Sequence, residues 1–258
     1  MKYYVVDSFT DKIFLGNPAG VCFLDYPIDK KIMQNIAAEN NLAETAFVIR
    51  NGDDFDLRWF TPINEINLCG HATLAAAFII SNFIDIGKTK MKFDTLSGVL
   101  SVVRKNDLYE MDFPAWIISP IETTQLMKAA ININIIETYL ARDLILVVHS
   151  EDEVRNMVPN MDLLKKITES HGISVTAKGD TVDFVSRFFA PNMGIPEDHV
   201  TGSVHCELIP FWAKRLNKNI MTAKQLSKRG GILLCKYTGE RVKIAGKAVL
   251  YMAGEINL

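Results

Sequence analysis

The stretch that decides the fold is Leu68–Ile80, which reads LCGHATLAAAFII. Glycine and histidine stand near its start, and the small and branched apolar residues that follow are typical of a helix that begins at Gly70. We expect this helix to span 70–83. Its apolar side chains cover every face, so it must be buried on all sides. An antiparallel sheet that curls around the helix is the simplest way to bury it.

The second half of the chain repeats this arrangement. Residues Arg58–Pro62 resemble Arg187–Pro191, and both segments follow a strand-like run. Downstream, Gly202 opens a second apolar run, for which we expect a helix over 202–216. A strand that starts with glycine follows each helix after nearly the same interval. Matches in the same order indicate a duplicated supersecondary unit.

The duplication predicts an α+β fold with two pseudo-symmetric lobes, each an antiparallel β-roll or barrel wrapped around a central α-helix. We expect the N-terminal lobe at 1–115 and the C-terminal lobe at 116–258. The last strand, about 248–258, is a candidate to cross to the first lobe. Paired lobes of this kind commonly bind small molecules.

Composition excludes several classes of protein. The chain has 258 residues, of which 48% are hydrophobic and 22% charged, as in a folded soluble domain. A net charge of −2 gives no reason to expect nucleic-acid binding. The longest apolar run is too short to span a membrane. Four widely spaced cysteines and no signal peptide favour a cytoplasmic protein with reduced thiols. The cysteines are Cys22, Cys69, Cys206 and Cys235.

The two helix starts are candidate binding sites. In each, a glycine precedes a polar side chain: Gly70 before His71, and Gly202 before Ser203. Unpaired backbone N–H groups and the helix dipole suit a carboxylate or a developing oxyanion there. The alternative is that the glycines are turn residues and Ser203 is a helix cap. For His71, the dipole favours the neutral imidazole.

Two acids are candidates for catalysis. Glu44 lies where a helix should end and a strand begin, which suits a general base, and the alternative is an exposed loop acid. Asp198 precedes the second helix start, where it could bind a substrate or equally be an exposed loop acid. No pair of histidines has the spacing of metal ligands, so we expect no metal. Motifs for dinucleotides, phosphate loops and serine hydrolases are absent.

Several blocks of the chain resemble one family. The blocks are Asp7–Thr10, Gly16–Ala19, Asn41–Phe47, Leu57–Pro62, Leu68–Ala75, Pro196–Cys206, Gln225, Arg229–Gly231 and Gly246–Val249. Together they are similar, nearly from end to end, to the phenazine-biosynthesis PhzF-like isomerases. The resemblance implies a diaminopimelate-epimerase-like fold and an isomerase without a cofactor, often a homodimer. It also implies a small carboxylate-bearing substrate, which in the family's namesake is trans-2,3-dihydro-3-hydroxyanthranilate.

The resemblance also implies roles for the candidate residues. It assigns the proton-transferring base to Glu44. It assigns substrate binding or help with proton movement to His71, Asp198 and Ser203. None of these residues departs from the family's pattern.

The resemblance places substrate-binding backbone at Gly70 and Gly202. We expect Thr201, next to Gly202, to bind the substrate as well. Related epimerases and racemases use two opposed cysteines as bases. Here Cys69 stands at the first of those positions, but Thr201 stands at the second. A racemase with two thiols is therefore not supported.

The sequence thus predicts an isomerase that moves a proton at carbon, with Glu44 as base and then acid. The alternatives are an epimerase, a racemase or a dehydratase with the same site, or a small-molecule-binding protein without activity. His199 stands where the family usually has proline, and Asn67 stands where an aspartate is common. Because of these two differences, the resemblance does not identify the substrate.

Overall fold

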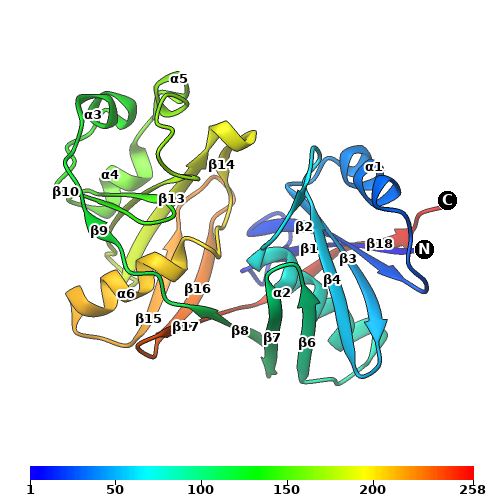
Figure 1. Cartoon of the computed structure of the whole chain (residues 1–258). Coiled ribbons are helices and arrows are strands. Elements are labelled where there is room, and N and C mark those ends of the chain that lie inside the picture. Colours follow the sequence, from blue (N-terminus) through cyan, green and yellow to red (C-terminus); the bar gives the residue numbers. More distant parts are fainter. The chain divides into compact units, whose positions relative to one another are not determined.

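The computed structural model describes residues 1–258, and the chain divides into two compact units (Figure 1). The first unit consists of Met1–Phe113 with Ile244–Leu258, and the second of Pro114–Lys243. The sequence analysis placed the boundary slightly later, at 115. The C-terminal strand β18 (Ala248–Glu255) lies in the first unit, where it pairs antiparallel with β1 (Lys2–Ser8).

Strands of the first unit form a curled mixed sheet. Besides β1 and β18 they are β2 (Asn17–Leu24), β3 (Glu44–Asn51), β4 (Asp54–Phe60), β5 (Glu65–Ile66), β6 (Lys90–Thr95), β7 (Gly98–Lys105) and β8 (Leu108–Pro114). Most neighbours are antiparallel, but β2 pairs parallel with β3 and β4 pairs parallel with β6. A parallel pair needs a crossover, and α1 (Lys30–Asn40) provides it between β2 and β3. The Asp29 side chain caps α1 by accepting from the N–H of Lys31 at 2.6 Å.

The helix that the sequence marked as the core is α2 (Gly70–Ile79). Nine of its ten residues are buried, and it packs against β1, β2, β3 and β18. Ala75, Ala76 and Ala77 have no exposed surface, so the small side chains let strands approach from several directions. The expectation of burial on all sides is confirmed.

This helix ends earlier than the predicted 83. A π-helical turn, Ile80–Ile84, follows α2, and the N–H of Asp85 bonds to the carbonyl of Ile80 at 2.7 Å. The side chain of Asn82 donates to the carbonyl of Phe78 at 2.7 Å. That carbonyl is the acceptor that an α-helix would offer to the backbone N–H of Asn82, so the side chain competes with the α-helical pattern.

The second unit also contains both antiparallel and parallel strand pairs. Its strands are β9 (Ser119–Pro120), β10 (Glu137–Leu140), β11 (Leu144–Val147), β12 (Ile173–Lys178), β13 (Phe184–Ala190), β14 (Ile195–Asp198), β15 (Ile220–Gln225), β16 (Gly231–Tyr237) and β17 (Arg241–Gly246), whose last residues belong to the first unit. Shorter helices are α3 (Gln125–Ile131), α4 (Glu151–Asn156), α5 (Met161–Leu164) and a 3₁₀ turn at Pro191–Met193. Both units mix sheet and helix, which agrees with the predicted α+β class.

The central helix of the second unit is α6 (His205–Leu216), which starts later than the predicted 202. Tighter 3₁₀-type bonds precede it, from the N–H of His205 to Gly202 and from that of Cys206 to Ser203. The carbonyl of Thr201, which an α-helix would offer to the N–H of His205, instead accepts from the His205 Nδ1–H at 2.7 Å. The same residue's side chain therefore takes the bond that would extend the helix.

His205 makes the free energy of unfolding of the second unit depend on pH. Burial lowers the pKa of His205 to about 4. Between pH 6.5 and 4, His205 therefore binds a proton in the unfolded chain but not in the folded one. This part of the free energy of unfolding falls as the pH falls. Burial, and then Asp143, raise the pKa of Glu207 to about 7, which gives the opposite slope.

We predict that His205→Gln makes the free energy of unfolding less sensitive to acid between pH 6.5 and 4, because the residue that gains a proton on unfolding is gone. Urea unfolding at several pH values measures this. Glu207→Gln is the control and should change the slope in the other direction. Parallel pH curves for wild type and His205→Gln would contradict the prediction.

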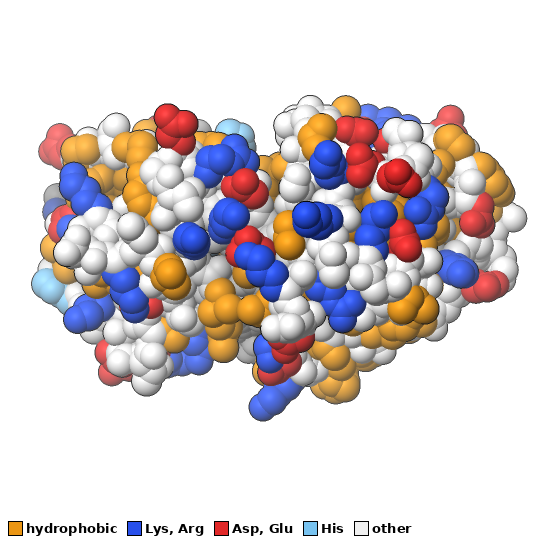
Figure 2. Space-filling view, turned by 90° about the horizontal axis from the view of Figure 1, so that it is seen from below, with side chains coloured by type: hydrophobic (Ala, Val, Ile, Leu, Met, Phe, Trp, Pro, Cys, Tyr) orange, Lys and Arg blue, Asp and Glu red, His pale blue; other side chains and the backbone are white.

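No helix of the structure is long and apolar enough to cross a membrane. On the face shown in Figure 2, basic and acidic side chains are interspersed. This distribution agrees with the small net charge of −2.

Candidate functional site

Glu44 and His71 form a buried pair in the first unit. Glu44 begins β3 and His71 is the second residue of α2, and their Oε2 and Nε2 atoms lie 3.1 Å apart. Their side chains are only 9% and 5% exposed. The contact is an ion pair without the alignment of a hydrogen bond. Glu44 is therefore no exposed loop acid, and the structure removes that alternative.

The fold brings a third residue to the other side of the imidazole. Asn17 begins β2, and the parallel pairing of Ala19 with Glu44 sets this end of β2 beside the start of β3. The Nδ2 atom of Asn17 lies 3.2 Å from Nδ1 of His71, and Asn17 is fully buried. An amide serves either form of the ring, because its nitrogen donates to a bare Nδ1 and its oxygen accepts from a protonated one.

The charge of His71 differs from the sequence expectation. Burial lowers the pKa of His71, but the neighbouring Glu44 carboxylate raises it, and the net result lies well above its ordinary value. The helix dipole favours the neutral ring, yet nearby opposite charge outweighs it. The pair can thus hold one proton between a buried carboxylate and a buried imidazole.

Cys69 completes this group. It is the N-cap residue of α2, and its Sγ atom lies 3.5 Å from Nδ1 of His71. Burial, and then the Glu44 charge, raise the pKa of Cys69, so the thiol stays protonated at neutral pH. One donor atom each from Glu44, Cys69 and His71 lies within 4.8 Å of the others, a set that could ligate a zinc-like cation. Histidine spacing alone could not reveal it, because only Cys69 and His71 are neighbours in the chain and Glu44 comes from a separate strand.

Two hydroxyl groups anchor the start of α2. The Ser8 hydroxyl donates to the carbonyl of His71 at 2.8 Å, and the Thr73 hydroxyl donates to that of Cys69 at 2.6 Å. The backbone N–H groups of Gly70 and His71 donate to no group of the chain, as is usual in the first turn of a helix. They are available to an anion.

Asp198 and Thr201 form the core of a second group, in the second unit. Asp198 ends β14, and its Oδ2 atom accepts from the Thr201 hydroxyl at 2.5 Å. Gln225 of β15 clamps the turn between them: its Nε2 donates to the carbonyl of Asp198 and its Oε1 accepts from the N–H of Thr201, both at 2.8 Å. The clamp is fully buried and fixes the direction of the turn.

The remaining candidates follow this turn. The carbonyls of Gly202 and Ser203 accept the 3₁₀-type hydrogen bonds before α6. The Ser203 side chain is half-buried and makes no hydrogen bond within the chain. Thr201 carries no thiol and its hydroxyl is engaged with Asp198. In the sequence, Asn17 and Gln225 stand out only as residues of the family-like blocks. Their pairing with His71 and with Thr201 depends on strand neighbours that local patterns do not specify.

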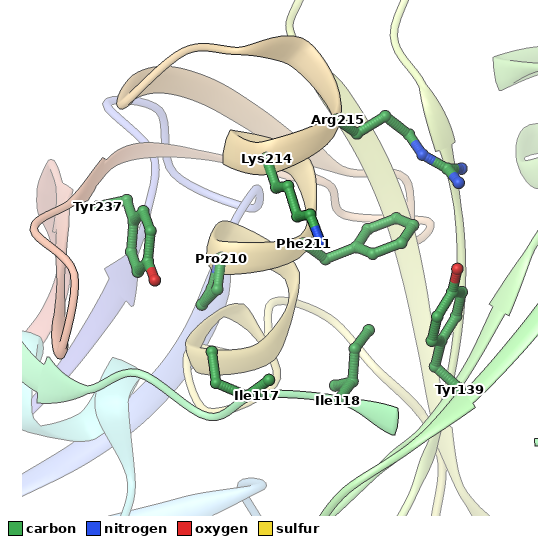
Figure 3. Close-up of a pocket in the computed structure, with 8 residues that line it drawn as sticks. All are labelled: Ile117, Ile118, Tyr139, Pro210, Phe211, Lys214, Arg215 and Tyr237. Atoms are coloured by element: carbon green, nitrogen blue, oxygen red, sulfur yellow. The ribbon is translucent and has the colours of Figure 1, made fainter. Parts of the chain in front are cut away.

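A pocket of the second unit lies elsewhere (Figure 3). Its volume is about 650 Å³, and none of the candidate residues lines it. Pro210 inside α6 has no N–H, which leaves the carbonyl of Cys206 free to accept from the N–H of Trp116 at 2.9 Å. That bond docks the segment with Ile117 and Ile118 beside the helix. The lining residues are Ile117, Ile118, Tyr139, Pro210, Phe211, Lys214, Arg215 and Tyr237.

Comparison with solved structures defines the class of the protein. A probable proline racemase from Agrobacterium radiobacter aligns with a TM-score of 0.70 over 100% of this chain and 93% of that one, at 10% identity. That likeness concerns the fold alone. The protein thus has the fold of the racemases and diaminopimelate epimerases.

The family follows from the sequence match. A family model described as phenazine biosynthesis-like protein matches residues 6–254, so the chain belongs to the PhzF family. An uncharacterised isomerase of Pseudomonas aeruginosa is 46% identical over 100% of this chain and 99% of its own length. A PhzF-family structure from Enterococcus faecalis superposes with a TM-score of 0.98 at 46% identity, over 100% of this chain and 99% of that one. The protein is an enzyme of the isomerase class.

Proposed function

We propose that the protein moves a proton between carbon atoms of a small carboxylate-bearing molecule, without a cofactor. Glu44 is the base that removes the proton and the acid that returns it. The observation that carries this proposal is the contact of 3.1 Å between the buried Glu44 carboxylate and His71. Two adjacent titratable groups that are shielded from water suit general acid–base catalysis.

The proposed steps balance without an oxidant. The Glu44 carboxylate takes a proton from a C–H bond, and the electron pair of that bond shifts into the conjugated system of the substrate. Glu44 then returns the proton to another carbon, so the double bond moves. His71, whose pKa the Glu44 carboxylate raises, supplies a compensating positive charge beside the base.

Stabilisation of the developing negative charge comes from backbone N–H groups. Those of Gly70 and His71 at the start of α2 lack partners within the chain, and Gly202 and Ser203 are the matching residues in the repeat. Donors aimed at developing charge are worth about 3–4 kcal/mol each in well-studied enzymes. Asp198 and Ser203 provide polar groups for the substrate in this proposal.

A racemase that uses two thiols as bases is a weaker hypothesis. The Cys69 thiol has a raised pKa, and the matching position holds Thr201, whose hydroxyl donates to Asp198. Neither group is a ready base at neutral pH.

Proton NMR in heavy water tests the proposal. Wild type is incubated with trans-2,3-dihydro-3-hydroxyanthranilate and then with a panel of small amino and hydroxy acids, with and without EDTA. We expect deuterium uptake or isomerisation of at least one compound, unchanged by EDTA. Loss of the activity on chelation would contradict proton transfer by the side chains alone. Absence of exchange and of isomerisation across the panel, with wild type shown to be folded, would contradict the proposal.

We predict that Asp198→Asn lowers kcat/KM for the active compound at least ~10-fold, because a charged partner of the substrate becomes neutral while its bond from Thr201 can persist. Steady-state kinetics measures this. The control is Asp162→Asn in the same unit, where the side chain is 91% exposed. Equal kinetics for wild type and Asp198→Asn would remove Asp198 from the site.

A further inference from the structure

Two arginine–glutamate pairs occupy equivalent places in the two units. In the first fork, Arg58 of β4 donates to Glu65 of β5 through Nε to Oε1 at 2.7 Å and through Nη2 to Oε2 at 3.0 Å. In the second fork, Arg187 of β13 donates to Glu197 of β14 through the same atoms at 2.7 and 3.0 Å. The bidentate geometry is thus repeated atom for atom.

The forks also have the same place relative to the helix starts. Glu65 stands five residues before Gly70, and Glu197 stands five residues before Gly202. In each unit the arginine lies on the long strand and the glutamate on the short strand that pairs with it. Each fork therefore ties the segment that leads to a helix start to a long strand of its sheet.

Packing around each fork favours a fixed geometry. The Arg58 guanidinium lies 5.3 Å from the ring centre of Phe60, and that of Arg187 lies 5.1 Å from that of Phe189. One partner of each fork is well buried, since the Glu65 side chain is 8% exposed and the Arg187 side chain 12%, whereas Arg58 is 35% and Glu197 23% exposed. Bidentate pairs hold direction as well as distance.

Further contacts of the two forks differ. Lys30 of α1 also pairs with Glu65, at 2.6 Å, whereas Arg187 donates from Nη1 to the carbonyl of Met157 at 2.8 Å. The segments beyond the forks differ too, since one leads to Cys69 and His71 and the other begins with Asp198. The shared element is the fork itself, and the chemistry that follows it varies.

We infer that Arg58 and Arg187 are positioning residues, each of which fixes one of the two groups of candidate site residues through its glutamate. The turnover part of this inference rests on the proposed function. The geometric part stands without it. A misplacement of about 1 Å at catalytic groups can cost ~100-fold in rate.

The test uses Arg58→Lys and Arg187→Lys, which keep the charge but cannot make the bidentate pair. Histidine resonances report on each group separately. We expect Arg58→Lys to shift the imidazole resonances of His71 and leave the Nδ1–H resonance of His205 unchanged. We expect Arg187→Lys to shift the His205 resonance, because that group bonds to Thr201, and to leave His71 unchanged.

Kinetics gives the second readout. On the compound found active in heavy water, each variant should lose ~10- to 100-fold in kcat while thermal unfolding shows a folded protein. Arg215→Lys is the matched control, because Arg215 also contacts both oxygens of a glutamate, Glu137, but lies near the end of α6. It should change neither histidine nor kcat. If a lysine variant fails to fold, Glu65→Gln or Glu197→Gln replaces it.

The outcomes separate the two proposals. If a folded fork variant keeps the histidine resonance of its own unit, the inference is wrong whatever the protein catalyses. Lower thermal stability with unchanged kcat and resonances would make the forks structural only. If wild type shows no exchange at all, the proposed function fails, and the resonances still decide whether the forks position their segments.

Discussion

Replacement of Glu44 by glutamine is expected to lower turnover at least ~100-fold, which is the lower end of the contribution of a general base. Glutamine has nearly the same shape as glutamate, but its amide cannot accept a proton from carbon. The substitution also removes one of the charges that raise the pKa of His71. The two effects have one cause, so they should appear together.

Exchange of substrate protons in heavy water measures the first effect, and NMR titration of the His71 imidazole measures the second, as a decrease in its pKa. Glu39→Gln is the control, since Glu39 is exposed on α1 and contacts none of the candidate site residues. Near-normal turnover of a folded Glu44→Gln protein would rule out Glu44 as the base. A fall in the pKa of His71 with normal turnover would leave only a structural role for the pair.

Leu74→Ala should destabilise the first unit by about 3–5 kcal/mol, because it leaves a cavity within a helix that is enclosed by strands. Leu74 has no exposed surface and lies beside Gly246 of β17. A helix packed on several sides has little freedom to collapse into the space. The loss is a large fraction of the 5–15 kcal/mol that stabilises typical domains.

Urea unfolding, followed by circular dichroism, measures the change in the free energy of unfolding. The control is Leu96→Ala, because the Leu96 side chain lies in a turn and is 65% exposed. It should change stability by less than about 0.5 kcal/mol. Equal effects of the two substitutions would mean that α2 is not the core element that its burial indicates.

The sequence by itself determined the core helix and the repeat. Apolar residues on every face of Leu74–Ile80 require burial on all sides, which is a local property that any fold must satisfy. Glu44 and His71 also stood out, because a polar residue at the start of a strand or helix is visible in the pattern. These features depend on residues that are neighbours in the chain.

Only the tertiary structure decided which groups meet and in what charge state. The contact of His71 with Asn17, the clamp of Gln225 on the turn after Asp198 and both forks join residues that lie apart in the sequence. Helix bounds moved for the same kind of reason, since the side chains of Asn82 and His205 use carbonyls that the α-helix pattern needs. The pKa of His71 follows from burial and from neighbours brought by other elements, which outweigh the local helix dipole. Strand pairing creates these contacts, and a local pattern of residues carries no record of the register in which distant strands pair.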